Sequence, residues 1–188
     1  NGPLYVRARV LVGTNWSAIV EGLLSPPQDL SKLHLTEIMY NPPGTNLVDG
    51  DEFEFLEFKN TGTNTLNLSG LRFTSGLTFN FPIGASLEAG RFFVLARNPA
   101  QFSARYPGVQ VRGIYSGRLD NAGETLRLVS PIGGTILSVS YNDRAPWPVT
   151  ADGNGFSAVP ANPNSNPAPS EGRYWRGSTA LGGSPGAD

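Results

Sequence analysis

Apolar residues along this chain fall in many short runs that alternate with polar residues, and glycine, proline and asparagine separate the runs. A period of two places successive side chains on opposite faces of a strand, so the pattern predicts β-structure along most of the chain. Strands are expected within segments 33–39, 53–58, 66–73, 79–81, 91–96, 123–129 and 135–141.

A single short helix is expected, near 99–106. Asn98 can cap its N-terminus and Pro99 fits the first helical position, where no backbone N–H is needed. Residues 131–134 are typical of a tight turn and predict a hairpin between the last two strands. These elements predict an all-β fold class with one short helix.

The first 32 residues form a separate flank in this interpretation. Segments 4–12 and 16–20 predict a β-hairpin that turns at 13–15, and consecutive prolines within 25–29 indicate a stiff linker. An isolated hairpin is marginally stable in water, so we expect it to pack on another module, with Trp16 in that module's core. The main domain is expected at 33–188.

The run 52–58 does not fit a strand with one apolar face. Strict alternation places Leu56 and Phe58 on one face with glutamates, while Glu57 shares the other face with Phe55. Either a bulge shifts the register, or Glu57 points toward the core and needs a partner. We favour Glu57 as a structural buried carboxylate that accepts hydrogen bonds from nearby backbone; a carboxylate site is the alternative.

Composition excludes several classes of protein. The chain has 188 residues, 39% of them hydrophobic, which suffices for one domain with a flank or two small ones. Its 23 glycines and 16 prolines show no period, which excludes collagen. The net charge of −1 comes without runs of like charge, so we expect no nucleic-acid partner.

Cysteine is absent, which excludes disulfides, thiolate metal sites and a thiol nucleophile. No stretch approaches the roughly 18 to 20 apolar residues that would span a bilayer, so no membrane insertion is expected. The chain opens directly in strand-like sequence at Asn1, without a leader, and we expect it to be a piece of a longer protein.

Calcium is the one cofactor that the sequence suggests. Asp49 and Asp51 flank a glycine, and Asp152 precedes another, so these carboxylates are the candidate metal ligands. The twelfth position counted from Asp152 is Pro163, where an EF-hand requires a bidentate glutamate. Asp-Gly pairs are also strong turn signals, and we favour the turn interpretation.

Four aromatic residues near the C-terminus form the candidate ligand-binding set: Trp147, Trp175, Tyr141 and Tyr174. Such rings can stack on sugars, or they can close the open end of a sandwich, and we favour the second role.

No catalytic residue is expected. The single histidine, His34, lies between two leucines on a strand that would aim it at solvent, and no Gly-x-Ser-x-Gly sequence accompanies it. The spacing of the carboxylates indicates no glycosidase pair.

Several motifs occur together in a defined order and resemble bacterial members of the lamin tail domain family. They lie at 35–44, 51–60, 68–73, 119–128, 138–141, 147–148, 151–157, 175–178 and 183–186. The resemblance implies an immunoglobulin-like β-sandwich that serves as a non-catalytic module of secreted or surface proteins. The chain shows neither coiled-coil heptads nor a C-terminal prenylation cysteine, features that would point to the nuclear relatives. The flank is similar to the last two strands of fibronectin-type modules.

We therefore expect a structural or interaction module of a larger bacterial extracellular protein. Its expected partners are neighbouring domains of the same polypeptide, with a protein or polysaccharide surface as a further candidate. The alternatives are a carbohydrate-binding module that uses exposed aromatics and, more weakly, part of a secreted hydrolase.

Overall fold

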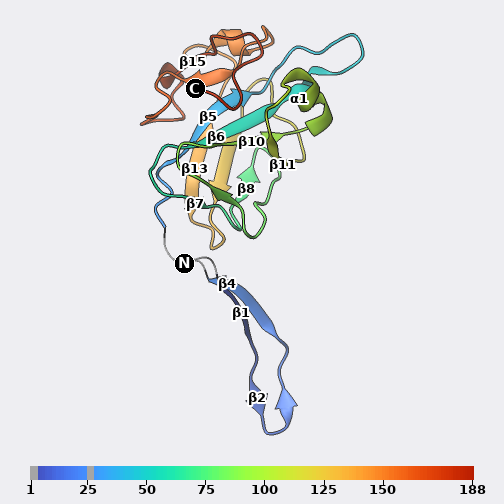
Figure 1. The fold of residues 1–188 in the computed structure, drawn as a ribbon, viewed down its shortest axis with the longest axis vertical. Coiled ribbons are helices and arrows are strands. Elements are labelled where there is room, and N and C mark those ends of the chain that lie inside the picture. Colours follow the sequence, from blue (N-terminus) through green and yellow to red (C-terminus); the bar gives the residue numbers. More distant parts are fainter. Residues whose placement is uncertain (1–3, 25–27) are drawn as a thin grey trace.

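The computed structural model describes residues 4–24 and 28–188, and it places a β-hairpin apart from a β-sandwich (Figure 1). The hairpin pairs β1 (Leu4–Ala8) with β4 (Val20–Leu24), and β2 (Leu11–Val12) with β3 (Asn15–Trp16) near its tip. The predicted hairpin is present, but its returning arm differs from the expected 16–20: β3 ends at Trp16, residues 17–19 are not strand, and β4 begins only at Val20. Part of the predicted linker, residues 25–27, lies outside the described residues.

The sandwich contains a six-stranded sheet and a three-stranded sheet. The order of the larger sheet is β11 (Val111–Ile114), β10 (Phe92–Ala96), β6 (Phe55–Asn60), β5 (Leu33–Met39), β14 (Ala158–Pro160) and β15 (Trp175–Gly177). The smaller sheet has the order β13 (Thr135–Ser140), β12 (Thr125–Val129) and β8 (Arg72–Ser75). All neighbours in both sheets are antiparallel except β10 and β11.

Short elements complete the domain. The strands β7 (Leu66–Asn67) and β9 (Ser86–Leu87) pair with each other. The described residues also include one α-helix, α1 (Pro99–Arg105), and three 3-10 turns: η1 (Gly50–Phe53), η2 (Val149–Ala151) and η3 (Gly172–Tyr174). None of the described helices is long and apolar enough to cross a bilayer.

The main hydrophobic core lies between the two sheets. Leu56 and Phe58 enter it from β6, while Leu126 and Leu128 enter from β12 on the opposite sheet. The Phe58 and Phe73 rings meet across the layers, with centroids 6.1 Å apart. The predicted all-β, immunoglobulin-like sandwich is therefore confirmed.

A second, smaller core covers the outer face of the larger sheet. Met39, Phe55, Val94 and Ala96 pack there against Phe102 of α1. The helix is held in place by Asn98, whose side chain accepts a hydrogen bond from the Ala100 amide at 3.0 Å, as predicted for the cap. Because both faces of β6 are covered, all of its residues are buried, and this explains why its sequence shows no clean apolar phase.

The structure corrects three predicted strands. The segment expected at 53–58 begins only at Phe55, because η1 occupies the preceding residues. The segment expected at 66–73 is split into β7 and β8 by a turn in which Gly70 has a φ of 74°. Residues 79–81 form an isolated bridge to β8 through Asn80 rather than a strand.

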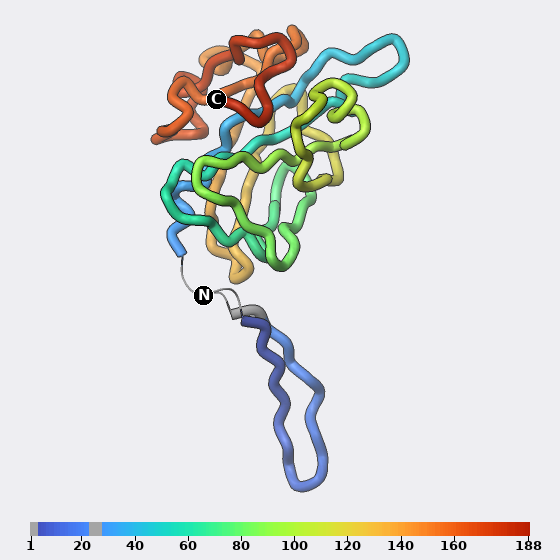
Figure 2. Tube along the Cα trace, in the orientation of Figure 1, coloured from blue at the N-terminus to red at the C-terminus, as the bar shows by residue number. Residues whose placement is uncertain are grey.

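The chain after residue 143 returns to the larger sheet. In Figure 2 this last part, orange to red, lies at the end of the sandwich opposite the hairpin. There β14 pairs with β5, and β15 pairs with β14. The C-terminal residues then run back along the outer face of the sheet to contact Glu37 and Glu57.

Candidate functional site

Three glutamates are almost completely buried in the sandwich. Glu54 is 0% exposed, and Glu37 and Glu57 are each 1% exposed. Glutamate is rarely buried to this extent unless it is paired, so these side chains are candidates for a functional site.

Glu37 and Glu57 lie directly opposite each other across the β5–β6 ladder. The register of the ladder shifts between Leu35 and Glu37, so that Thr36 is an extra residue in β5. Such a bulge re-aims the strand that carries it. As a result both carboxyl groups point to the outer face of the sheet, on the same side as Lys59 and away from the main core.

Hydrogen bonds hold both carboxyl groups. For Glu57, the Thr36 hydroxyl donates to Oε1 at 2.8 Å, and the Gly186 amide donates to Oε2. For Glu37, the Ser184 amide donates to Oε1 at 3.0 Å, and the Ser157 hydroxyl donates to the same atom. Glu37 Oε2 has no hydrogen-bond partner. The donors come from β5, from the residue just before β14 and from residues 184–186, and they converge on this pair.

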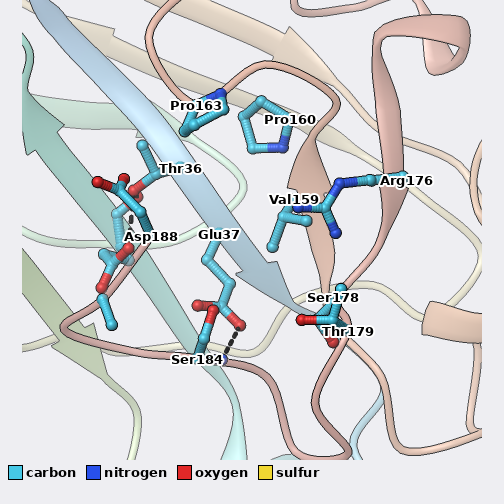
Figure 3. A pocket seen from close by; sticks show the side chains of 12 residues that line it. Thr36, Glu37, Val159, Pro160, Pro163, Arg176, Ser178, Thr179, Ser184 and Asp188 are labelled. Carbon is cyan, nitrogen blue, oxygen red and sulfur yellow. Dashed lines mark hydrogen bonds between the residues drawn. The ribbon is translucent and has the colours of Figure 1, made fainter.

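A small cavity adjoins the pair (Figure 3). It has a volume of about 50 Å³, and its lining includes Thr36, Glu37, Glu57, Arg176, Ser184 and Asp188. Sites for small organic ligands usually measure roughly 300–1,000 Å³. The cavity is therefore of a size for a water molecule or a small ion rather than for an organic substrate.

Burial changes the acidity of the pair. Loss of hydration raises the pKa of Glu37 to about 7, although the hydrogen bonds from Ser157 and Ser184 oppose this. Loss of hydration also raises the pKa of Glu57 to about 8, and the like charge of Glu37 adds to the effect. Near neutral pH the pair therefore retains a proton.

Glu54 occupies a different position, at the C-cap of η1. The Tyr115 hydroxyl and the Leu119 amide each donate to its Oε2 at 2.9 Å. Burial raises the pKa of Glu54 to about 8. Its contacts fasten the segment after β11 to the start of β6, which is a structural role.

The four candidate aromatic residues do not form an open platform. Trp147 and Trp175 are 6% and 5% exposed, and their rings stack on each other with centroids 5.3 Å apart. Tyr141 is buried beside Trp147, and Trp175 Nε1 donates to the Pro169 carbonyl at 2.9 Å. Tyr174 is half-buried against the main core. These rings fill the end of the sandwich.

The candidate metal ligands are engaged with other groups. Asp49 accepts a hydrogen bond from the Asp51 amide at 3.0 Å and caps η1. The Asp51 carboxylate lies 3.3 Å from Arg97 and 3.6 Å from Arg118. Asp152 Oδ1 accepts from the Asn41 amide at 2.7 Å. Across residues 4–24 and 28–188, no three histidine, aspartate or glutamate side chains are grouped so that they could hold a metal ion.

His34 is partly buried at the start of β5, rather than fully turned to solvent. Its Nε2 donates to the Ser31 carbonyl at 3.1 Å, and burial lowers its pKa. No hydroxyl nucleophile is hydrogen-bonded to this ring in the part of the chain that the structure describes.

Sequence reasoning singled out Glu57 but missed Glu37 and Glu54. The signal for Glu57 was its place within an apolar run. Glu37 stands opposite it only because of the bulge at Thr36, and a bulge leaves no clear mark in a single sequence. The donors at Ser157, Ser184 and Gly186 lie more than a hundred residues away along the chain.

Together, these features define a class of protein. Two packed sheets with short connections and a filled end are typical of an immunoglobulin-like domain. A model of the lamin tail domain family matches residues 26–143, and the chain belongs to this family of non-enzymatic, immunoglobulin-like domains. Comparisons with curated proteins and with solved structures gave no match.

Proposed function

We propose that this chain is a non-catalytic interaction module of a larger bacterial protein, secreted or displayed at the cell surface, and that its N-terminal hairpin packs on a neighbouring β-module of the same polypeptide. The family assignment supports an interaction role. The observation that supports the packing of the hairpin on a neighbouring module is its amphipathic surface.

The two faces of the hairpin differ in chemistry. On one face, Leu4, Val6, Ala8 and Val20 alternate along the paired strands. Leu4 is 62% exposed and Val20 is 70% exposed, so this face is uncovered by the residues that the structure describes. A two-stranded ribbon needs a packing partner to be stable in water. The apolar face is where such a partner would lie.

The other face is polar and satisfied within the hairpin. The Tyr5 hydroxyl donates to Glu21 at 2.5 Å, and Arg7 Nε lies 2.8 Å from the same carboxylate. Near the tip, outside the β1–β4 pairing, the Trp16 ring that is expected to enter the neighbouring module is 53% exposed, and its centre lies 4.2 Å from the Arg9 guanidinium. This distribution suits a ribbon that packs on one face only, as the last two strands of a sandwich sheet do.

Hydrogen exchange tests the proposal. The amides of β1 and β4 should exchange quickly in the 188-residue chain and at least tenfold more slowly in the longer natural polypeptide. In that polypeptide, Val6→Asp should abolish the extra protection. The matched control Arg7→Gln, on the polar face, should largely preserve it. Equal exchange in the two polypeptides would overturn the proposal.

Carbohydrate binding has less support from the arrangement of the aromatic residues. The faces of Trp147 and Trp175 are buried against each other, so a sugar ring could not stack on them without rearrangement. Binding on a glycan array that is lost in Trp175→Ala, with the fold intact, would favour this alternative instead. Hydrolysis of a polymer by the purified chain would favour the hydrolase alternative.

A further inference from the structure

The last seven residues form a strap across the outer face of the larger sheet, here called the C-terminal strap (182–188). The Tyr106 hydroxyl donates to the Gly182 carbonyl at 2.6 Å. The Ser184 and Gly186 amides donate to Glu37 and Glu57, and Lys59 Nζ lies 2.5 Å from the Asp188 carboxylate. The strap is therefore held mainly by contacts with ionisable side chains on the outer face of the sheet: Tyr106, Glu37, Glu57 and Lys59.

The backbone of the strap at Gly183 packs directly against the Glu37 carboxyl group. Gly183 has a φ of 87°, a conformation that favours glycine. A Cβ on this residue would collide with Glu37 Oε1 and approach Ser157 Oγ. The strap thus depends on a tight fit to the Glu37 carboxyl group.

No cation neutralises the two glutamates. Two basic side chains lie in this region: Lys59 follows Glu57 by two residues on β6, and Arg176 of β15 lines the adjoining cavity. Lys59 pairs with Asp188, which is itself acidic, and Arg176 donates to the Gly177 carbonyl at 3.0 Å. Among the described residues, neither glutamate forms an ion pair with a basic side chain. Like charges directly opposite on neighbouring strands repel, so the pair is a site for a proton.

We propose that a proton held by the Glu37–Glu57 pair keeps the C-terminal strap closed, and that loss of this proton opens the strap and exposes the outer face of the sheet. This inference does not depend on the partner of the hairpin. This face adjoins a hollow of about 470 Å³, with residues 185–187 as one wall. Its lining includes both apolar and charged side chains: Phe92, Val94, Val109, Glu88, Arg91 and Arg112. Opening would extend this hollow across β5 and β6.

The direction of the pH effect follows from the burial. With the strap open, both carboxyl groups meet water and return toward the ordinary glutamate pKa of about 4.3. With it closed, burial raises the pKa of Glu37 to about 7 and that of Glu57 to about 8. The closed form binds protons more tightly, so it is favoured at low pH. It loses this advantage as the pH rises toward 8.

Amide hydrogen exchange resolved by residue tests this proposal on the whole chain. After correction for intrinsic rates, the protection factors of Ser184 and Gly186 should fall at least tenfold between pH 5.5 and pH 8.5. The double variant E37Q/E57Q keeps the shape of both side chains and removes their charge. Its strap amides should show no such fall.

Two control variants separate the strap from general stability. Glu54→Gln changes another buried carboxyl group whose partners, Tyr115 and Leu119, lie outside the strap, so the pH profile of Ser184 and Gly186 should stay as in the natural chain. Asp188→Asn removes the ion pair with Lys59. It should lower protection of the strap at every pH without flattening the profile.

Protection that is constant with pH, or that increases above pH 7, would overturn the proposal. The same holds if E37Q/E57Q keeps the profile of the natural chain. Should the double variant not fold, the natural chain still decides: the side-chain carboxyl ¹³C signals of Glu37 and Glu57 should titrate above pH 6. Midpoints near the ordinary value of about 4.3 would refute it.

Discussion

Glu57 faces Glu37 across two antiparallel strands, and both side chains are 1% exposed. The pair occupies the same outer face as Phe55, so the second core of the domain ends in a row of ionisable groups rather than in solvent. The C-terminal strap covers this row. The stability of the domain should therefore depend on the protonation of these two residues.

The variant Glu57→Gln should reduce the pH dependence of stability. The raised pKa of Glu57, about 8, means that its contribution is present at low pH and is lost as the pH rises through that value. The fall in the free energy of unfolding between pH 5 and pH 9 should be smaller in the variant by about 1–3 kcal/mol, since each pKa unit corresponds to about 1.4 kcal/mol. Urea titrations at the two pH values measure it, and an unchanged fall would contradict the assignment.

The variant Phe58→Ala should strongly destabilise the sandwich. Phe58 is 1% exposed and contacts Phe73 across the two sheets. Removing a buried phenylalanine ring leaves a cavity and costs about 3–5 kcal/mol. The matched control is Leu47→Ala, because Leu47 is 95% exposed and its truncation should change stability by less than about 0.5 kcal/mol. Similar losses in both variants would show that the main core is placed wrongly.

The variant Trp175→Ala should destabilise the end of the sandwich. It removes the stack with Trp147 and leaves the Pro169 carbonyl without its donor. The expected loss is about 3–5 kcal/mol in chemical denaturation. Tyr174→Ala, at a half-buried neighbour, should cost less. A variant of Trp175 as stable as the natural chain would indicate that this ring is exposed in solution and available to a ligand.

Calcium should leave the melting temperature unchanged. Asp51 already forms ion pairs with Arg97 and Arg118, and Asp152 accepts a hydrogen bond from Asn41. These carboxylates would have to give up their present partners before they could bind an ion. Binding to the folded state alone would raise the melting temperature with ion concentration. Calorimetry with and without millimolar calcium checks this. A melting temperature that rises with calcium concentration would show that the folded domain binds the ion.

Local features of the fold could be predicted because their causes are local. The alternation at 33–39 coincides with β5, and Asn98 with Pro99 marked the start of α1. The turn at 131–134 was expected from its glycines, and it joins β12 to β13. The order of the motifs was enough to indicate the family, which the match at 26–143 confirms.

The candidate site was predictable only in part. The run 52–58 predicted either a bulge or a buried Glu57 that points toward the core. Glu57 is buried, but its side chain lies on the outer face of the sheet, and the bulge is in β5 rather than in β6. Periodicity is informative when one face is wet, and β6 is covered on both sides.

By itself, the sequence determined the positions of β5, β10, β12 and β13 to within about two residues, the class of the fold and the absence of thiol chemistry. Only the tertiary structure decided that Glu37 meets Glu57, that the two tryptophans are buried against each other, and that the chain end fastens to β5 and β6. The reason is distance along the chain. Strand period and turns depend on neighbouring residues, whereas the bulge at Thr36 and the return of residues 182–188 are set by packing between segments far apart in the sequence.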